Sequence, residues 1–415
     1  MEFSVPISPF MHTYYEKDYI FVDAAAARYY SDNTCMHTQN ITVEFYMMYL
    51  PERNFNTNTY FDGIKKMLTL DKIKENADRI PKTSWLMRRM LSAYPGTGTI
   101  YVAVATDARN SEYYSVYVPI HNYACYLSDD ADCEILDDFL SKFICATFLF
   151  VGVFVCYFGH RFFKTEMFLF GMLSGGMITF IIISSIADPN HRPAITMASV
   201  LSGLFFGAIW LTFWWFYGIP VIAVSLPTLN LGFLVAAIIY NKFPGDVVLL
   251  QVNFNFWILF ILIMLLTSMM LVSVAFVSNI LCCAVLGAYA VIYPIDFYLG
   301  SNLKYIIINT VRRATVPKFN MAVLNLPFEW RDILVITLWI GLAVSGFLFQ
   351  NYHNRGRPPF PPPPRSVRPG TPIRHRYGTT SPANRTADSE PTTSPPPYRD
   401  SATPEEYSER SPLLA

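Results

Sequence analysis

Two long stretches in the second half of the chain contain no charged residue. Residues 193–241 and 247–295, 49 positions each, lack Asp, Glu, Lys and Arg. A helix needs about 20 apolar residues to cross the hydrocarbon layer of a membrane, so each stretch is long enough for two crossings. A helix on the surface of a soluble protein would show polar residues at a helical period, and these stretches show none. The pattern excludes a soluble globular protein and predicts insertion into lipid.

The hydropathy pattern predicts seven membrane-spanning helices. They cover residues 139–158, 167–186, 194–216, 218–240, 256–276, 277–299 and 333–349. Several connections are too short for anything but antiparallel neighbours. The expected fold is therefore a membrane all-α protein, a seven-helix transmembrane bundle (139–349). A β-rich lumenal or extracellular domain (1–138) precedes it, and a disordered cytosolic tail (350–415) follows it.

Residues 1–138 have the composition of a domain in water. Segments 41–45, 99–104 and 113–118 are rich in β-branched and aromatic residues and are bounded by turn formers, which predicts strands. Residues 63–80 carry apolar side chains at helical spacing and end before Pro81, which predicts one helix. We expect a β-rich domain with one flanking helix.

Charge near the span ends predicts the orientation. The loop 159–164 and the arginines that follow the last span lie on the same side in a seven-span count, and positive charge marks the cytosolic side. The N-terminal domain is then lumenal or extracellular. The basic segment 301–332 falls on that same outer side. Its residues Leu303, Ile306, Ile307 and Val311 can share one apolar face, so we expect an interfacial helix there.

The tail and the N-terminus show two further features. Residues 351–415 contain 15 prolines and almost no apolar periodicity, a composition that predicts disorder. Residues 1–10 contain neither a basic start nor an apolar run, so no signal peptide is visible. We therefore expect the natural start of the protein to lie upstream of Met1.

Three cysteines fall in the N-terminal domain. Cys125 and Cys133 flank a short polar turn, and we expect them to form a disulfide in an oxidising compartment. Cys35 is then left over, which suggests a partner outside this sequence. The alternative is three free thiols in a cytosolic domain. Asn40 begins a glycosylation sequon that is reachable in a lumenal domain.

Several stretches resemble the transmembrane 7 superfamily member 3 family. They are the sequence FGHRFFKTE at 158–166 and shorter segments at 123–125, 287–292, 295–296, 342–346, 355–358 and 409–414. The resemblance implies a multi-pass protein of the secretory and endolysosomal system, and we expect it in the plasma membrane, the endolysosomal membrane or both. It also implies a role in stress homeostasis and cell survival, without enzyme activity. Family members carry a signal peptide and a longer glycosylated ectodomain, and this chain shows neither.

Short motifs in the tail predict protein partners. Glu409, Leu413 and Leu414 fit the acidic dileucine signal that clathrin adaptors bind. Pro395, Pro396 and Tyr398 fit the PPxY ligand of WW domains, which ubiquitin ligases of the Nedd4 type carry. The prolines at 361–364 beside an arginine give a weaker ligand for an SH3 domain. An inert Pro-rich tail is the alternative.

Asp296 is an acidic residue inside a predicted span. Intramembrane acids often mark ion or substrate paths, so Asp296 raises the alternative of a transporter or channel. It lies about one turn from the interface, and an ion pair with Lys304 or Arg312 would be structural instead. A G-protein-coupled receptor is a weaker alternative, because the third span has no acid-Arg-Tyr triplet and the last has no Asn-Pro-x-x-Tyr.

The remaining classes find no support in the sequence. No HExxH, GxSxG, P-loop or zinc-ligand spacing is present, so we expect no enzyme, cofactor or metal. The 31 basic residues equal the 31 acidic ones, so we expect no nucleic-acid partner. A non-enzymatic trafficking or scaffold protein, bathed in membrane lipid, is the expected function.

Overall fold

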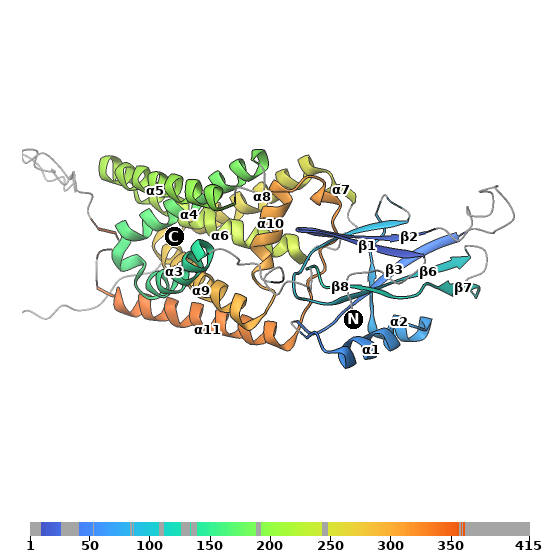
Figure 1. Cartoon of the computed structure of the whole chain (residues 1–415). Helices are drawn as coiled ribbons and strands as arrows, with labels where there is room; N and C mark the ends of the chain where they lie inside the picture. The colour runs from blue at the N-terminus through green and yellow to red at the C-terminus, as the bar shows by residue number, and fades with distance from the viewer. Residues whose placement is uncertain are drawn as a thin grey trace, which may run out of the picture. The chain divides into compact units, whose positions relative to one another are not determined.

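The computed structural model describes residues 10–25, 41–52, 54–83, 85, 87–107, 112–125, 133, 139–187, 192–242, 248–356, 358 and 360–361. The N-terminal part of these residues forms two antiparallel sheets (Figure 1). The first has the order β1 (Met11–Glu16), β2 (Tyr19–Ala24), β5 (Arg88–Ser92). The second has the order β4 (Asp78–Ile80), β3 (Ile41–Tyr49), β6 (Thr99–Asp107), with β7 (Tyr114–Val116) and β8 (Ile120–Asn122) paired along the other side of β6.

The second sheet is covered on both faces. Alternate residues of a strand point to opposite sides. In β3, Phe45 packs against the first sheet, whereas Tyr46 packs toward Met67 and Ile73 beside helices α1 (Thr57–Lys66) and α2 (Leu70–Asn76). The first sheet, the second sheet and the helix pair therefore form three layers, with α1 and α2 on the outside (Figure 1).

The single helix expected over 63–80 is wrong. The side chain of Asn56 caps the start of α1, which ends at Lys66, and α2 starts again after Thr69. The backbone of Ala77 is extended, and residues 78–80 pair with 45–47 of β3 as strand β4. The strand expected over 113–118 is shorter and covers 114–116.

Within the described residues, seven long helices follow this two-sheet sandwich, whose strands lie between residues 11 and 122. They are α3 (Phe139–Phe158), α4 (Phe163–Ile186), α5 (Arg192–Tyr217), α6 (Pro220–Lys242), α8 (Asn253–Val272), α9 (Ala275–Leu299) and α11 (Trp330–His353). Six are long and apolar enough to cross a membrane, whereas the apolar part of α3, Lys142–Phe158, is shorter. The short helices α7 (Val248–Gln251) and α10 (Tyr305–Thr315) lie between them in sequence.

Helix α9 is the central helix of the bundle. In its most apolar window 61% of residues are buried, compared with 17% in α8 and in α11. The other helices leave large apolar side chains exposed, as a lipid environment requires. In this bundle the sandwich end is where α9 ends and α10 begins, and the tail end is where α3 and α11 end.

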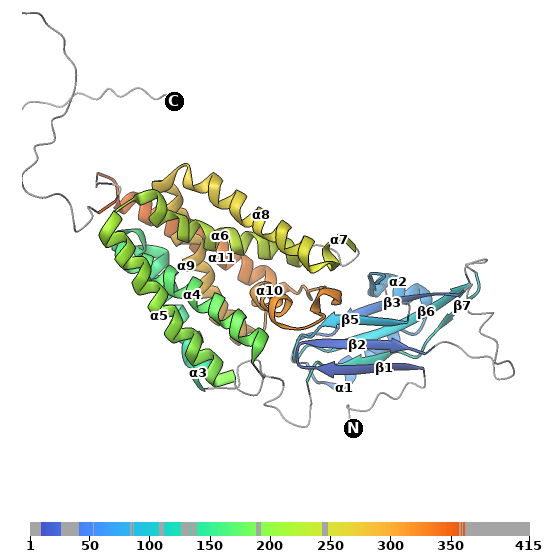
Figure 2. The same cartoon turned by 90° about the horizontal axis from the view of Figure 1, so that it is seen from above.

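Helices α4 and α5 pack at very close range (Figure 2). Small residues at the interface allow this approach. A Cβ atom on Gly203 would lie 2.6 Å from the carbonyl oxygen of Met172, and one on Gly207 would lie 2.7 Å from that of Phe168. The glycines of both helices are therefore used for packing within the chain.

Candidate functional site

A buried ion-pair cluster lies at the sandwich end of the bundle. The ammonium group of Lys304 lies 3.9 Å from an Asp296 carboxylate oxygen and 3.9 Å from a Glu52 carboxylate oxygen. The three side chains are 3%, 0% and 6% exposed. Glu52 belongs to the N-terminal domain, so one lysine joins this domain to the last turn of α9.

The turn after α9 brings these groups together. Gly300 has a φ of +72° and its N–H donates to the carbonyl oxygen of Asp296. This left-handed residue ends the helix and reverses the chain, so that the backbone N–H of Lys304 donates to the Asp296 carboxylate at 2.5 Å. A Cβ atom on Gly300 would lie 3.2 Å from the Glu52 carboxylate. Glycine is therefore required by both the φ angle and the close approach.

The start of α11 completes the cluster. Glu329 and Asp332 form a capping box, in which each side chain accepts from the other residue's backbone N–H. The second carboxylate oxygen of Asp332 accepts from the N–H of Asn302 at 2.7 Å, and Glu329 accepts from the N–H of Glu52 at 3.1 Å. The two acids thus fix α11 both to the α9–α10 turn and to the sandwich.

Helix α10 makes a second contact with the sandwich. The Arg312 guanidinium pairs with Asp18 at 3.0 Å and donates to the carbonyl oxygen of Ala93 at 2.8 Å. The segment after α10 then runs beside β5, where the N–H of Val323 donates to the carbonyl oxygen of Met90 at 2.8 Å. The first sheet is therefore extended by a residue of the helical region.

The other side of α10 is attached to the bundle. Asn309 donates to the side chain of Asn241 on α6 at 3.0 Å, and Arg313 donates to the carbonyl oxygen of Leu250 at 2.7 Å. The apolar residues Ile306 and Ile307 pack against buried side chains of α6, α8 and α9. The expected amphipathic helix is present, but protein rather than water covers its polar face.

Asp296 Oδ1, Ser301 Oγ and Asn302 Oδ1 are buried without a hydrogen-bond partner in the described part of the chain. Burial raises the pKa of the neighbouring Tyr94 to about 12, so this phenol stays neutral. Among the described residues no group of three or more His, Cys, Asp or Glu side chains could hold a metal ion.

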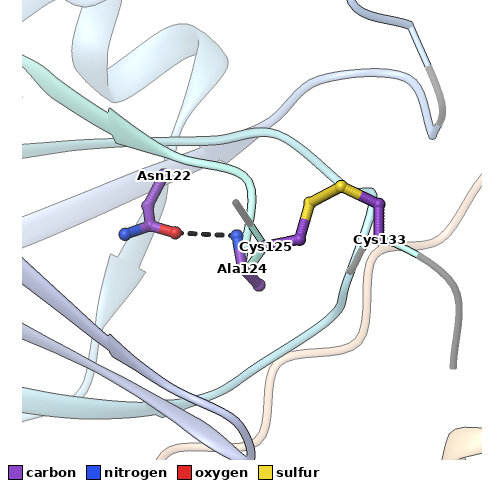
Figure 3. Close-up of a disulfide and its surroundings, with 4 residues drawn as sticks. All are labelled: Asn122, Ala124, Cys125 and Cys133. Carbon is purple, nitrogen blue, oxygen red and sulfur yellow. Dashed lines mark hydrogen bonds between the residues drawn. A yellow bond between two sulfur atoms is a disulfide. The ribbon is translucent and has the colours of Figure 1, made fainter. Parts of the chain in front are cut away.

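The sandwich contains the expected Cys125–Cys133 disulfide, with a sulfur–sulfur distance of 2.10 Å (Figure 3). The side chain of Asn122 accepts from the N–H of Ala124, which has a φ of +55°. This turn aims Cys125 away from the end of β8 and toward Cys133 (Figure 3).

The other predicted sites lie outside the described residues. These are Cys35, Asn40, Pro395, Pro396, Tyr398, Glu409, Leu413 and Leu414. Of the two partners considered for Asp296, the structure places Lys304 beside it, whereas Arg312 faces Asp18.

The contacts of Glu52, Asp296, Lys304, Asp332 and Arg312 at the sandwich end form the junction between the sandwich and the bundle. Sequence reasoning missed Glu52 and Asp332 in this junction, and also Glu166 and Asn279 at the tail end. One signal was available for Glu166, because it is the last charged residue before a long uncharged helix. No local signal marks Glu52, whose partner is 252 positions away in sequence.

Comparisons with known proteins agree with this architecture. Residues 1–128 match the family model "TM7SF3-like, second immunoglobulin-like domain", and residues 145–351 match "TM7S3/TM198-like domain". Proteins called "Transmembrane 7 superfamily member 3" are similar over 77% of the chain: those of Homo sapiens and Mus musculus are 31% identical and that of Rattus norvegicus is 30% identical.

The chain spans 56% to 57% of the length of these relatives. No significant match was found among solved structures. The matched models indicate no enzyme family. With an immunoglobulin-like sandwich followed by apolar helices, the chain belongs to the transmembrane 7 superfamily member 3 family and is an integral multi-pass membrane protein.

Proposed function

We propose that this chain is a non-enzymatic membrane scaffold with a trafficking role. Its immunoglobulin-like domain faces the lumen or the cell exterior, and its tail lies in the cytosol. The buried junction carries the proposal, because Lys304 and Arg312 attach the sandwich to the bundle as one body. A ligand bound to such a domain would be held in a fixed orientation relative to the membrane.

Two observations favour a scaffold over a transporter or channel. The carboxylate of Asp296 is engaged by Lys304, which supports a structural role for this intramembrane acid. A partly open pocket between α6 and α8 has a volume of about 10 Å³ and is lined mainly by apolar side chains such as Ile239, Leu259 and Phe260. A cavity of about 10–15 Å³ holds at most one water molecule.

The tail supplies the trafficking role. Glu409, Leu413 and Leu414 would bind a clathrin adaptor, which would direct the protein from the plasma membrane to endolysosomal membranes. Pro395, Pro396 and Tyr398 would bind a WW-domain ubiquitin ligase, and the prolines at 361–364 are a weaker candidate for an SH3 domain. The stress-homeostasis role suggested by the family resemblance would depend on this delivery, and Asn40 would carry a glycan.

Surface biotinylation of cells that express the double variant Leu413→Ala/Leu414→Ala tests the sorting role. We expect more protein at the plasma membrane than with the control Ser411→Ala/Pro412→Ala, because only the leucines fill the adaptor pockets. Equal surface levels of both variants would remove the adaptor from the proposal.

A pull-down with isolated WW domains tests the second partner. Tyr398→Ala should abolish capture of the full-length chain, whereas the neighbouring Arg399→Ala should retain it, because the motif ends at Tyr398. Undiminished capture of Tyr398→Ala would remove the ligase.

A further inference from the structure

A carboxylic acid is buried at the tail end of the bundle, far from the junction in sequence. Glu166 lies in the first turn of α4 and is 1% exposed. Its Oε2 accepts from the Asn279 amide at 3.0 Å. Its Oε1 has no hydrogen-bond partner, and Glu166 forms no ion pair with any described residue. Among the described residues, no positive charge pairs with this buried acid.

Asn279 holds the acid in place from the central helix α9. This residue is 0% exposed, and its amide nitrogen also lies 3.0 Å from His160 Nδ1 and 3.9 Å from Cys283 Sγ. Its own Oδ1 has no partner among the described residues. One amide group thus contacts an imidazole, a thiol and a carboxyl group from α4, α9 and the 3-10 turn His160–Phe162.

The titratable groups around Glu166 are few. Helix α9 contributes the thiols of Cys282 and Cys283, helix α3 contributes that of Cys156, and the turn between α3 and α4 contributes the His160 imidazole. The nearest cations in sequence, Arg161 and Lys164, have exposed side chains. Helix α5 has no acid or base in its membrane-spanning part, and α11 contributes the amide of Gln350 beside His160.

A carboxylate without a cation is strongly disfavoured in an apolar interior, and such a group binds a proton instead. The geometry fits a neutral acid, because the amide donates to one oxygen and leaves the other to carry hydrogen. A metal cation would need several ligands, and the described part of the chain contains no group of three or more His, Cys, Asp or Glu side chains that could hold one. We propose that Glu166 and Asn279 form a proton-binding site at the tail end of the bundle.

The site adjoins the place where the tail contacts the helices. The Phe163 ring lies 5.0 Å from that of Trp214 and 5.3 Å from that of Phe360, and the His160 ring lies 5.8 Å from that of Phe360. Release of the proton would create a charge one helical turn from Phe163. Binding or release of the proton at Glu166 would therefore change how Phe360 packs against Phe163 and His160.

Infrared spectroscopy of the full-length protein in nanodiscs tests whether the proton is bound. At neutral pH, where exposed carboxylates are ionised, the spectrum should contain the C=O band of a protonated acid. Glu166→Gln should lose this band, whereas Asp62→Asn, at an exposed position of α1, should keep it. Labelling with ¹³C-glutamate should shift the band in the wild-type protein, which keeps the test valid if Glu166→Gln does not fold. Absence of the band from the wild-type spectrum would overturn the proposal, and so would a band that ¹³C-glutamate labelling does not shift.

Thermal unfolding against pH tests the consequence. The folded state holds a proton that the unfolded chain releases above about pH 4.3, so stability should fall as pH rises above that value. In Glu166→Gln, the free energy of unfolding should depend less steeply on pH, by an amount that corresponds to the release of up to one proton. Identical slopes for the wild type and Glu166→Gln would contradict the proposal. Added Na⁺ or Ca²⁺ that stabilises the wild type and does not stabilise Glu166→Gln would also contradict it.

Tryptophan emission tests the link to the tail. The emission should change with pH in the wild type and not in Trp214→Phe, and a change that persists in Trp214→Phe would contradict the link to Phe360.

Discussion

The Lys304 ammonium lies 3.9 Å from a carboxylate oxygen of Asp296, and the left-handed turn at Gly300 separates the two residues. This pair closes the sandwich end of the central helix α9. Because Glu52 contacts the same ammonium, the pair also fixes the immunoglobulin-like domain. One cation therefore contacts both the helical region and the sandwich, beside the second contact that Arg312 makes with Asp18.

Removal of that cation should destabilise the whole protein. Lys304→Met would remove the cation that lies beside two buried carboxylates, and the loss of one member of a buried pair costs about 3–5 kcal/mol. Thermal unfolding in detergent should occur at a lower temperature than in Lys66→Met, at an exposed position of α1. The double variant Lys304→Met/Asp296→Asn should recover part of the loss. An unchanged unfolding temperature for Lys304→Met would show that the pair contributes no stability.

Two glycine-to-alanine substitutions should have opposite effects. In Gly203→Ala the new methyl group would meet the Met172 carbonyl oxygen at 2.6 Å and force α4 and α5 apart, at a cost of about 1–3 kcal/mol. At Gly341 on α11 no atom lies within 4 Å, so alanine should stabilise the helix by up to about 1 kcal/mol. Circular dichroism during heating measures both changes. A loss of stability in both variants would contradict the prediction, because it would show that the space around each glycine does not decide the effect of alanine.

The immunoglobulin-like domain should lose stability in acid. His121 on β8 packs its ring 4.6 Å from that of Tyr60, and burial lowers the pKa of this imidazole. The neutral form is therefore favoured in the folded state. Its contribution is complete above the unfolded value of about 6.5 and is lost as pH falls through the lowered folded value.

His121→Gln should reduce this acid sensitivity, and His12→Gln, at an exposed position of β1, should not. Unfolding of the intact chain, followed at pH values from neutral to endolysosomal, measures the effect. A pH profile identical to that of the wild type would exclude His121 as the cause.

The disulfide should stabilise the end of the sandwich. Its two cysteines are 8 positions apart, and a loop of this length corresponds to about 2–3 kcal/mol in the chain-entropy model. The double variant Cys125→Ser/Cys133→Ser should unfold at a correspondingly lower temperature. Mass spectrometry of wild-type protein digested without reductant should find the two cysteines in one linked peptide. Alkylation of both thiols without reduction would show that the bond is absent.

The helical half of the fold could be predicted closely because lipid imposes a local rule. A span must be apolar along its length, and the uncharged stretches of the sequence satisfy this rule directly. The errors lie at the ends, where polar residues belong to the helix. Helix α11 begins at Trp330 rather than 333 because Glu329 and Asp332 cap it, and it continues to His353 because Gln350 is buried against α3.

The sandwich could be predicted only in part, because its pairing is not local. The strands β3 and β6 were visible as apolar runs, whereas the first sheet depends on contacts such as Arg88 with Asp23, 65 positions apart. The junction shows the same contrast. Lys304 could be named as a partner of Asp296 because one turn joins them, but no nearby residue indicates that Glu52 completes the cluster.

The central proposal is that the sandwich and the tail lie on opposite sides of a membrane crossed seven times. The most direct measurement is antibody staining of cells that express the chain with one epitope before Met11 and another after Ala415, preceded by an added signal peptide. We predict that the first epitope is stained at the surface of intact cells and the second only after permeabilisation. Staining of both epitopes in intact cells, or of the second epitope alone, would contradict the seven-span account.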